Sequence, residues 1–344
     1  MKFAVGYQLA EGNETPFSEL ISDYTDKISE VYFPWLDIAT GRSAIATRHG
    51  ATDWTSQARL EGELVRFREM GIKLDLLLNA NCYGRLSMSE ELRNRVGSLL
   101  EYLKYQSPVG GVDIVTTASP FIAETVKKYF PEIDVRASVN MWLGTVKSMS
   151  YLADIFDSFY VQREYNRDIP YILELKKWCD EHGKGLYMLA NSGCFSYCTG
   201  HSFHDNLVAH EAEIAETKNV SDFMPYTCWR YLKKRENWHT ILQNSWVRPE
   251  DIHNYEGIIS TVKLATRMHA RPLMVIDAYC RGRFYGNLPD LMEPGFAPAI
   301  EPYIIDNKAL PDDFFERTST CDRRCHSCDY CKNALEAALI KMEP

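Results

Sequence analysis

DIVTTASPFIAETVKKYFPEIDVRA, residues 113–137, contains the repeating unit that decides the fold of this chain. The run Asp113–Thr117 has the length and the apolar, β-branched composition of a buried strand, and a similar run follows at Asp134–Ala137. Between them, Ser119 and Pro120 supply a helix N-cap and a first-turn proline for a segment of helical period. Two strands joined through a helix in this way predict a parallel βαβ unit.

The same alternation extends along most of the chain. Segments of helical period occupy 52–70 and 169–182, among others. Eight runs have the character of strands: Phe3–Gln8, Glu30–Phe33, Lys73–Leu78, Asp113–Thr117, Asp134–Ala137, Ser158–Val161, Gly185–Leu189 and Ile259–Leu264. They predict an α/β protein with a (β/α)8 TIM-like barrel whose last repeats are irregular. A doubly wound open sheet is the alternative, but no GxGxxG loop follows the first strand and no GxxxxGK[ST] motif occurs.

Composition limits the classes of protein that this chain can belong to. Its 344 residues, 45% of them apolar, suffice for one large core. We expect a barrel domain over 1–300, with a cysteine-bearing insertion near 191–248, and a cysteine-rich extension over 301–344. The sequence lacks both a signal-peptide pattern and the roughly 18 apolar residues of a membrane span, so we expect a cytoplasmic protein with reduced thiols. A net charge of −9 argues against nucleic acid as a partner.

Polar side chains follow several predicted strands. In a barrel, the residues just past the C-terminal ends of the strands form the mouth, where chemistry takes place. Arg163 and Glu164 follow the sixth strand. Arg163 suits a substrate carboxylate, which its guanidinium can hold through two parallel hydrogen bonds, and Glu164 is expected to hold that arginine or to act as an acid or base. A single asparagine is usually a turn residue, but several strand ends carry one, and these are the expected substrate contacts: Asn79, Asn81, Asn140 and Asn191.

Cys194 and Cys198 directly follow the seventh predicted strand, in NSGCFSYCTG at 191–200. Their thiolates are therefore expected at the barrel mouth. Soft thiolates bind iron–sulfur clusters or zinc, and the small residues around them allow sulfur atoms to converge without strain.

The C-terminal region carries a denser group of thiols. CDRRCHSCDYC, residues 321–331, places Cys321, Cys325, Cys328 and Cys331 within eleven residues. Four-cysteine zinc sites usually pair two short knuckles across a longer gap, so the crowded string favours iron–sulfur ligation, with zinc in the tail as the alternative. Its first three members also have the CxxxCxxC spacing of radical S-adenosylmethionine enzymes, although there the triad follows the first barrel strand.

Several segments resemble the collagenase-like peptidase U32 family. They are SFYVQREYNRDIP (158–170), NSGCFSYC (191–198), NSWVRPEDIHNYE (244–256), TVKLATR (261–267) and YGNLPDL (285–291). Despite its name, that family includes proteins that carry a [4Fe–4S] cluster and support oxygen-independent hydroxylation of ubiquinone precursors and RNA bases. The resemblance implies that Cys194, Cys198 and Cys228 are cluster ligands and that Arg163 and Glu164 lie beside the cluster. The cysteine spacing differs from that of the hydroxylases, so the chain looks like a divergent branch.

The seven clustered cysteines are one short of the eight that two fully ligated [4Fe–4S] clusters require. Either Cys82 or Cys280 supplies the eighth ligand, or one iron stays open to substrate. We therefore expect one or two clusters. Cys179, on the helix predicted at 169–182, is expected in the core.

Peptidase motifs are incomplete in this chain. HEAEI at 210–214 lacks the second histidine of HExxH, and no GxSxG elbow occurs. His201 and His204 follow Cys198 and are candidate metal ligands or proton donors, and the family resemblance favours His204. The predicted catalytic residues are thus Arg163, Glu164 and His204.

Taken with the resemblance, the sequence predicts an iron–sulfur enzyme that hydroxylates, or otherwise oxidises or reduces, a small organic or aromatic substrate with the help of an electron donor or protein partner. A non-catalytic cluster-bearing subunit of a heteromeric assembly is the first alternative, and a peptidase is the second. An exposed apolar patch would favour the subunit. A closed mouth lined by Asn79, Asn140 and Arg163 would favour the enzyme.

Overall fold

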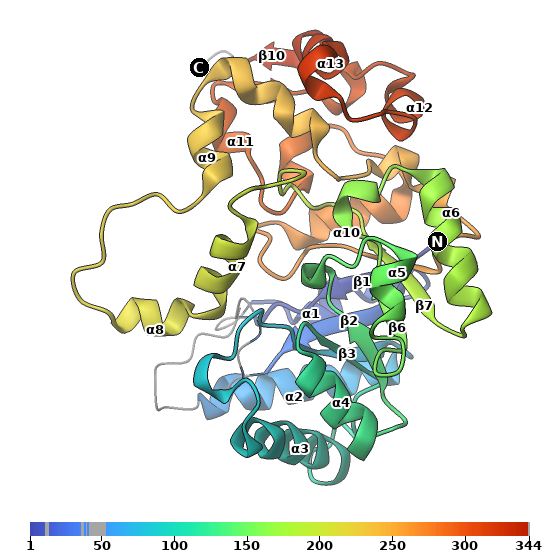
Figure 1. Cartoon of the computed structure of the whole chain (residues 1–344), viewed down its shortest axis with the longest axis vertical. Helices are drawn as coiled ribbons and strands as arrows, with labels where there is room; N and C mark the ends of the chain where they lie inside the picture. Colours follow the sequence, from blue (N-terminus) through green and yellow to red (C-terminus); the bar gives the residue numbers. More distant parts are fainter. Residues whose placement is uncertain (11–13, 36–37, 39, 41–52, 343–344) are drawn as a thin grey trace.

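Eight parallel strands close into a barrel in the computed structural model, which describes residues 1–10, 14–35, 38, 40 and 53–342 (Figure 1). The strands follow one another around the barrel in chain order, and β8 pairs with β1 to close it. Their bounds are β1 Lys2–Gly6, β2 Ile28–Pro34, β3 Lys73–Leu78, β4 Ile114–Thr117, β5 Asp134–Ala137, β6 Ser158–Tyr160, β7 Gly185–Leu189 and β8 Thr261–Lys263. The predicted TIM-like barrel is confirmed.

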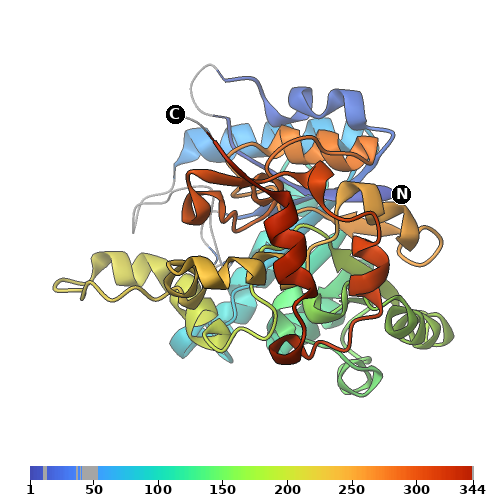
Figure 2. The same ribbon diagram turned by 90° about the horizontal axis from the view of Figure 1, so that it is seen from above.

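Helices cover the outside of the barrel (Figures 1 and 2). The main ones are α2 (Trp54–Glu69), α3 (Glu90–Tyr105), α4 (Pro120–Tyr129), α6 (Ile169–Glu181) and α10 (Pro272–Arg281), with the short α1 (Phe17–Leu20) and α5 (Val146–Ser150) between them. The Ser119 side chain accepts the Ile122 N–H and caps α4, as its sequence predicts. Asp53 caps α2 in the same way, and Thr52, where the sequence predicted that helix to begin, lies outside the described residues.

The apolar core lies between the strands and these helices. Leu60, Leu64 and Phe67 of α2 are fully buried together with Leu76 and Leu78 of β3. Burial of each such side chain contributes about 1.5–3 kcal/mol relative to exposure. Cys179 of α6 is also fully buried, as expected. Within the described ranges, no helix has both the length and the apolar character needed to cross a membrane.

Charged and aromatic side chains fill the middle of the barrel. Arg136 of β5 is fully buried, and its Nη1 and Nη2 donate to the two carboxylate oxygens of Glu30 at 2.7 and 3.2 Å. Its guanidinium also lies 3.6 Å from the ring centroid of Tyr187. Lys263 lies 3.9 Å from the Tyr32 ring. The lumen is therefore a packed core, and the open end of the barrel is its mouth.

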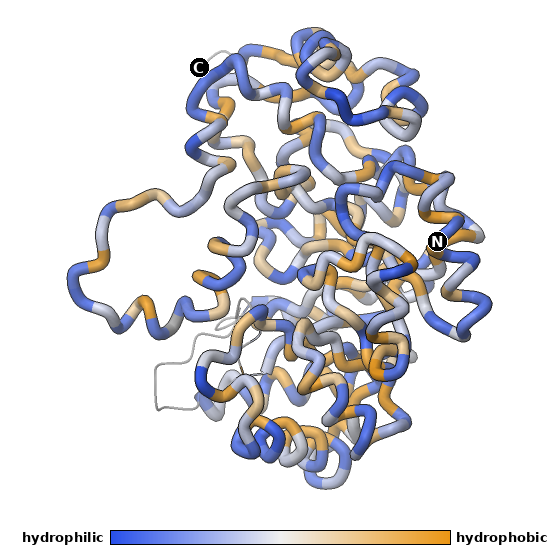
Figure 3. Tube along the Cα trace, viewed as in Figure 1, coloured by the Kyte–Doolittle hydropathy of each residue, from blue (hydrophilic) through white to orange (hydrophobic). Residues whose placement is uncertain are grey.

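The segment between β7 and β8 is long and irregular. It contains α7 (His201–Ala209), α8 (Glu211–Glu216) and α9 (Thr227–Leu232), followed by turns of 3-10 helix at Arg235–Gln243 and Pro249–Tyr255. The part from α7 to α9 projects from the barrel as an arm (Figures 1 and 2). Hydrophilic and hydrophobic residues alternate along the arm in Figure 3.

The C-terminal region packs against this long segment. It contains α11 (Ala297–Ile300), β9 (Tyr303–Ile305), α12 (Phe314–Ser319), α13 (Tyr330–Ala338) and β10 (Leu339–Lys341), and β10 pairs antiparallel with β9. The Phe314 ring stacks on Trp246 with centroids 5.7 Å apart. Arg235 Nη2 lies 3.2 Å from Glu336 Oε2. Residues 343–344 of the predicted extension lie outside the described residues.

Candidate functional site

A cavity of about 200 Å³ opens at the C-terminal ends of the strands, and we call it the mouth pocket. Loops that follow β3, β5, β6 and β7, together with α7 and α9, supply its walls. Among the residues that line it are eight of those predicted from sequence: Asn79, Asn81, Asn140, Arg163, Cys194, Cys198, His204 and Cys228. His201 lines it as well. Residues from five separate segments thus meet at the end of the barrel where a TIM-like fold places its chemistry.

Close approach at Gly200 brings the thiols together. Gly200 precedes α7, and a Cβ added to it would lie only 2.4 Å from Thr227 Oγ1 at the start of α9. The same Cβ would lie 3.8 Å from Cys198 Sγ. Because Cys228 is the second residue of α9, a larger side chain at 200 would separate the segments that carry Cys198 and Cys228.

The three thiols of the mouth pocket influence one another. Burial, with added contributions from the neighbouring Cys194 and Cys198, raises the pKa of the Cys228 thiol to about 11. Burial also raises the pKa of Cys198; Cys194 adds to that rise, and the positive charge of Arg163 opposes it. The thiols therefore share one low-dielectric environment with a cation beside them.

This donor set fits a group that prefers thiolates. Thiols from the β7–α7 loop and from α9 share one cavity, and soft metals and iron–sulfur clusters favour such ligands. Within the described residues, however, no group of three or more His, Cys, Asp or Glu side chains stands in an arrangement that already could hold a metal ion. The cysteine side chains would have to turn toward one another on binding.

A chain of contacts crosses the mouth pocket from Arg163 to Asn81. The Arg163 guanidinium lies 4.7 Å from the Trp142 ring centroid, and the Trp142 and His201 rings are 3.9 Å apart. His201 Nε2 lies 2.6 Å from Asp205 Oδ2, which also accepts a hydrogen bond from Asn81 Nδ2 at 3.0 Å. The contacts link Arg163 to His201 through the Trp142 indole.

Two buried polar atoms of the mouth pocket have no partner in the part of the chain that the structure describes. They are the acceptor Asn79 Oδ1 and the donor Trp142 Nε1. A buried polar group without a hydrogen bond is costly, by about 1–3 kcal/mol. A bound polar molecule or water would satisfy both atoms, so the pocket is built for a ligand with a donor and an acceptor.

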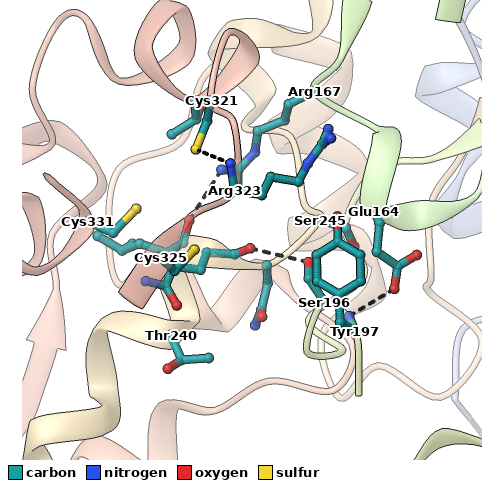
Figure 4. A pocket seen from close by; sticks show the side chains of 14 residues that line it. Glu164, Arg167, Ser196, Tyr197, Thr240, Ser245, Cys321, Arg323, Cys325 and Cys331 are labelled. Atoms are coloured by element: carbon teal, nitrogen blue, oxygen red, sulfur yellow. Dashed lines mark hydrogen bonds between the residues drawn. The ribbon is translucent and has the colours of Figure 1, made fainter. Parts of the chain in front are cut away.

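The tail cysteines line a second cavity, of about 270 Å³, which we call the tail pocket (Figure 4). Cys321, Cys325 and Cys331 line it, and all four tail cysteines line a hollow directly beside it. Burial raises the pKa of Cys331 to about 11, while the nearby cation Arg167 lowers it.

Arg167 gives the tail pocket its positive charge. Its guanidinium is buried against the Trp246 ring at 4.4 Å, and its Nε donates to the Trp246 carbonyl at 2.8 Å. Nη2 has no hydrogen-bond partner within the described residues. An unpaired guanidinium N–H beside Cys331 fits a site that holds negatively charged, metal-bound thiolates.

Comparison with known proteins finds a curated relative and similar solved structures. No family model matches the chain. The uncharacterized protease MJ1657 from Methanocaldococcus jannaschii is 25% identical over 276 residues, which is 79% of this chain and 79% of that protein. The structure of the U32 peptidase Mk0906 superposes with a TM-score of 0.51 at 16% identity, covering 77% of this chain and 92% of the other. The chain is thus similar to a curated protease and to a solved U32 peptidase. The resemblance expected from its sequence is confirmed, and the superposition shows the shared barrel.

Glu164 lies elsewhere than predicted. The sequence suggested that it holds Arg163 or acts beside it, but its carboxylate lines the tail pocket. Glu164 Oε1 accepts the Tyr197 N–H at 3.1 Å, and Oε2 accepts from Gln162 Nε2 at 3.1 Å. Arg163 and Glu164 both belong to the 3-10 turn Arg163–Tyr165, and their side chains line different cavities. Arg163 instead donates from Nη1 to Ser192 Oγ at 3.3 Å.

Asn191 was wrongly predicted to bind substrate. It is fully buried, and its Nδ2 donates to the carbonyls of Ala265 and Leu291 at 3.2 and 2.9 Å. Its Oδ1 accepts the Ala265 N–H at 2.6 Å. The amide therefore joins the loops after β7 and β8, and no polar atom remains for a substrate.

Neither candidate for an eighth cluster ligand lies with the other thiols. Cys280 of α10 is half-buried, and Asp26, Lys27 and Asp277 are the charged groups that act on it. It therefore lies beside the loop that enters β2, at the end of the barrel away from the mouth. Cys82 lies in the turn that contacts His210, since a Cβ added to the nearby Gly84 would be 3.5 Å from His210 Cε1.

Sequence reasoning missed Trp142 and Asp205. Asp205 stands four residues after His201 on α7, and the i, i+4 spacing of an acid and a histidine was a usable signal for their contact. Trp142 had no comparable signal. It adopts a left-handed backbone conformation with φ of 56°, which turns its indole between Arg163 and His201.

Proposed function

We propose that this U32 relative is an iron–sulfur enzyme that carries out oxygen-independent hydroxylation, or closely related redox chemistry, on a small anionic organic substrate. The observation that supports the proposal is the composition of the mouth pocket. Three thiols share one cavity with Arg163, two histidines and two unsatisfied buried polar atoms, at the catalytic end of the barrel.

Cys194, Cys198 and Cys228 would hold the cluster in the mouth pocket. When bound there, a [4Fe–4S] cluster supplies electron transfer and Lewis acidity to the cavity. The close packing of Gly200 on Thr227 supports this ligand set, because it holds the Cys198 and Cys228 segments together.

The other residues of the pocket would bind and orient the substrate. Arg163, steadied by Trp142 and Ser192, presents its guanidinium to a carboxylate. Asn79 Oδ1 accepts a hydrogen bond from a substrate hydroxyl, and Trp142 Nε1 donates one. His204, whose ring lies 4.9 Å from Tyr226, is the proposed proton donor.

The tail cysteines would hold a second group, either an iron–sulfur cluster or zinc. A cluster in the tail pocket would pass electrons to the mouth pocket. The loop Cys194–Cys198 supports this arrangement, because its two cysteines line the mouth pocket while Ser196 and Tyr197 line the tail pocket.

A non-catalytic subunit of a heteromeric assembly is the second candidate. One observation favours it: several large apolar side chains are exposed on the arm and beside it. They are Tyr197, Phe203, Val220, Phe223, Met224, Tyr226 and Tyr231. Such a patch is typical of a surface that meets another protein. The lined mouth pocket favours an enzyme, and the patch suits the redox partner of that enzyme.

Peptide hydrolysis is the third candidate, and its support is that one similar protein is named a protease and another a peptidase. The mouth pocket supplies thiols, an arginine and histidines, and it has no HExxH pair. We therefore rank hydrolysis below redox chemistry.

Anaerobic purification tests the leading proposal. We expect iron and acid-labile sulfide in the protein, and a paramagnetic resonance signal after reduction. Cys194→Ser, Cys198→Ser and Cys228→Ser should each remove the mouth-site iron, while Cys280→Ser, the matched control at the far end of the barrel, should retain it. Stoichiometric zinc without sulfide would exclude the iron–sulfur assignment. Peptidase activity that survives complete removal of iron would favour hydrolysis.

A further inference from the structure

Cys82, His210 and Glu213 form a cluster outside the two pockets. Cys82 lies in the loop after β3, and the Gly84 N–H donates to its Sγ at 3.4 Å. The His210 imidazole lies against the same turn, because a Cβ added to Gly84 would be 3.5 Å from His210 Cε1. His210 Nδ1 lies 3.1 Å from Glu213 Oε2. Thiol, imidazole and carboxylate therefore stand close together, with a backbone donor on the sulfur.

The residues that follow Cys82 hold its loop in place. The Tyr83 hydroxyl donates to the Leu78 carbonyl at 2.7 Å, and Gly84 has a φ of 53°, which starts the 3-10 turn Gly84–Leu86. His210 lies at the junction of α7 and α8. The sequence motif HEAEI, read as an incomplete HExxH, thus supplies both partners of a cysteine 128 residues away.

The charges around Cys82 favour its thiolate. His210 is the first cause of a lowered Cys82 pKa, the Gly84 N–H adds to it, and burial and the Glu213 carboxylate oppose it. In turn, Cys82 and Glu213 raise the pKa of His210. A thiolate paired with an imidazolium is the form in which cysteine is nucleophilic near neutral pH.

The cluster stands at the rim of the mouth pocket. Asn81 and Val208, which line that pocket, come just before Cys82 and His210 in the chain. Cys82 and His210 are partly exposed, and Glu213 is exposed, so the cluster lies at the protein surface. An open site of this kind suits thiol–disulfide exchange, which needs only an in-line approach to the sulfur atom. Acyl transfer to the same thiol would need an enclosed site that orients the acyl group.

We propose that Cys82, with His210 and Glu213, is a reactive-thiolate site that exchanges with small disulfides and carries a mixed disulfide at the rim of the mouth pocket. The Cys82 thiolate attacks one sulfur of R–S–S–R, so that a Cys82–S–S–R bond forms and the original S–S bond breaks. The electron pair leaves on the second sulfur, which takes the proton from His210. Cys82 is oxidised and one R–SH is released.

The mixed disulfide has a structural consequence for the mouth pocket. Asn81 adjoins Cys82 and donates to Asp205, whose carboxylate contacts His201. A substituent on the Cys82 sulfur is bulky and stands next to this contact. The modification therefore narrows entry to the pocket.

Alkylation of the full-length, anaerobically purified protein by iodoacetamide tests the site. The rate at Cys82 is followed at pH 6.5 by peptide mass spectrometry, with the half-buried Cys280 as an internal reference. We expect about tenfold slower alkylation of Cys82 in His210→Gln, because the variant loses the imidazolium that stabilises the thiolate. Glu213→Gln should slow it less, and the neighbouring exposed Glu211→Gln should leave it unchanged. Iron content should stay the same in all three variants.

Oxidised glutathione is the second probe. We expect a glutathione adduct on Cys82 of the wild-type protein, released by dithiothreitol, and much less adduct on His210→Gln. Equal alkylation rates in the wild type, His210→Gln and Glu213→Gln would overturn the proposal, as would adducts confined to other cysteines. Glu213 is exposed, so its variant keeps the test valid if His210→Gln fails to fold.

Discussion

Arg163 and Glu164 are neighbours in the chain, yet their side chains line two different cavities. Arg163 stands in the mouth pocket over Trp142, and Glu164 stands in the tail pocket, where it accepts the Tyr197 N–H. One turn of 3-10 helix therefore forms part of the wall between the two thiol sites. The division assigns anion binding to Arg163 alone and removes Glu164 from the set of residues that can contact a substrate in the mouth.

Arg163→Lys keeps the positive charge but loses the planar fork of the guanidinium. We expect the binding of small aromatic carboxylates to weaken by about 1–3 kcal/mol, the range for charge-assisted hydrogen bonds. Iron content and melting temperature should stay unchanged. Isothermal titration measures the affinity, with the exposed Arg95→Lys as a control. A lower melting temperature with unchanged affinity would instead assign Arg163 a structural role.

Serine at Cys321, Cys325 and Cys328 should remove the metal of the tail. These three cysteines are exposed, so their replacement leaves the core intact, whereas truncation would remove the buried Ala334, Leu335 and Ala338. We expect a lower metal-to-protein ratio by mass spectrometry, with the mouth-site iron retained, and a lower melting temperature, because metal binding stabilises short segments. The prediction fails if the triple variant retains the metal content of the wild type.

Gly200→Ala should disturb the mouth-pocket thiols by steric contact alone. Gly200 has a φ of −85°, which alanine adopts freely, but the new Cβ would meet Thr227 Oγ1. We expect iron to be lost while the far-ultraviolet circular dichroism is retained. Gly97→Ala is the control, because nothing lies within 4 Å of a Cβ added at that position. Alanine there, in α3, should raise the free energy of unfolding by about 0.5–1 kcal/mol. Full iron occupancy in Gly200→Ala would show that the contact does not position Cys198 and Cys228.

The buried carboxyl group of Asp75 should make the free energy of unfolding depend on pH. Burial in the barrel lumen raises its pKa from 3.8 to about 6, although Arg136 and Lys263 oppose the rise. The folded state therefore binds this proton more tightly than the unfolded state. The resulting stability is fully present below pH 3.8 and is lost as pH rises through about 6.

Asp75→Asn removes this contribution, and thermal unfolding measures it. The melting temperature of the wild type minus that of Asp75→Asn should increase as the pH falls from about 6 to about 4. Asp312→Asn, at an exposed position, controls for the loss of one carboxylate. A difference that stays flat over this range would contradict the raised pKa.

The barrel could be predicted because its signals are local. Runs such as Lys73–Leu78 are short and mostly apolar, and the bounds of this one are the same in the structure as in the sequence interpretation. The position of Cys194 and Cys198 followed from the same information, since residues after a barrel strand emerge at the mouth. Neither inference required knowledge of contacts between distant segments.

The direction of a side chain just past a strand could not be predicted. The alternation that fixes side-chain direction ends with the strand, so the 3-10 turn at Arg163 and Glu164 decides their opposite placement. Asn191 misled for another reason, since an amide binds backbone groups as readily as substrate. The pairing of Cys82 with His210 depends on where the arm lies, which a local sequence pattern does not encode.

Helix α7 connects the mouth pocket, His210 and an exposed aromatic pair. Its inner side presents His201, His204 and Asp205 to the mouth pocket, and its C-terminus leads to His210. Its outer side carries the exposed Phe203, whose ring lies 6.5 Å from that of Phe223. Because one short helix carries Phe203 and the imidazoles of the mouth pocket and ends at His210, a shift of Phe203 along with it would move these imidazoles and His210 together.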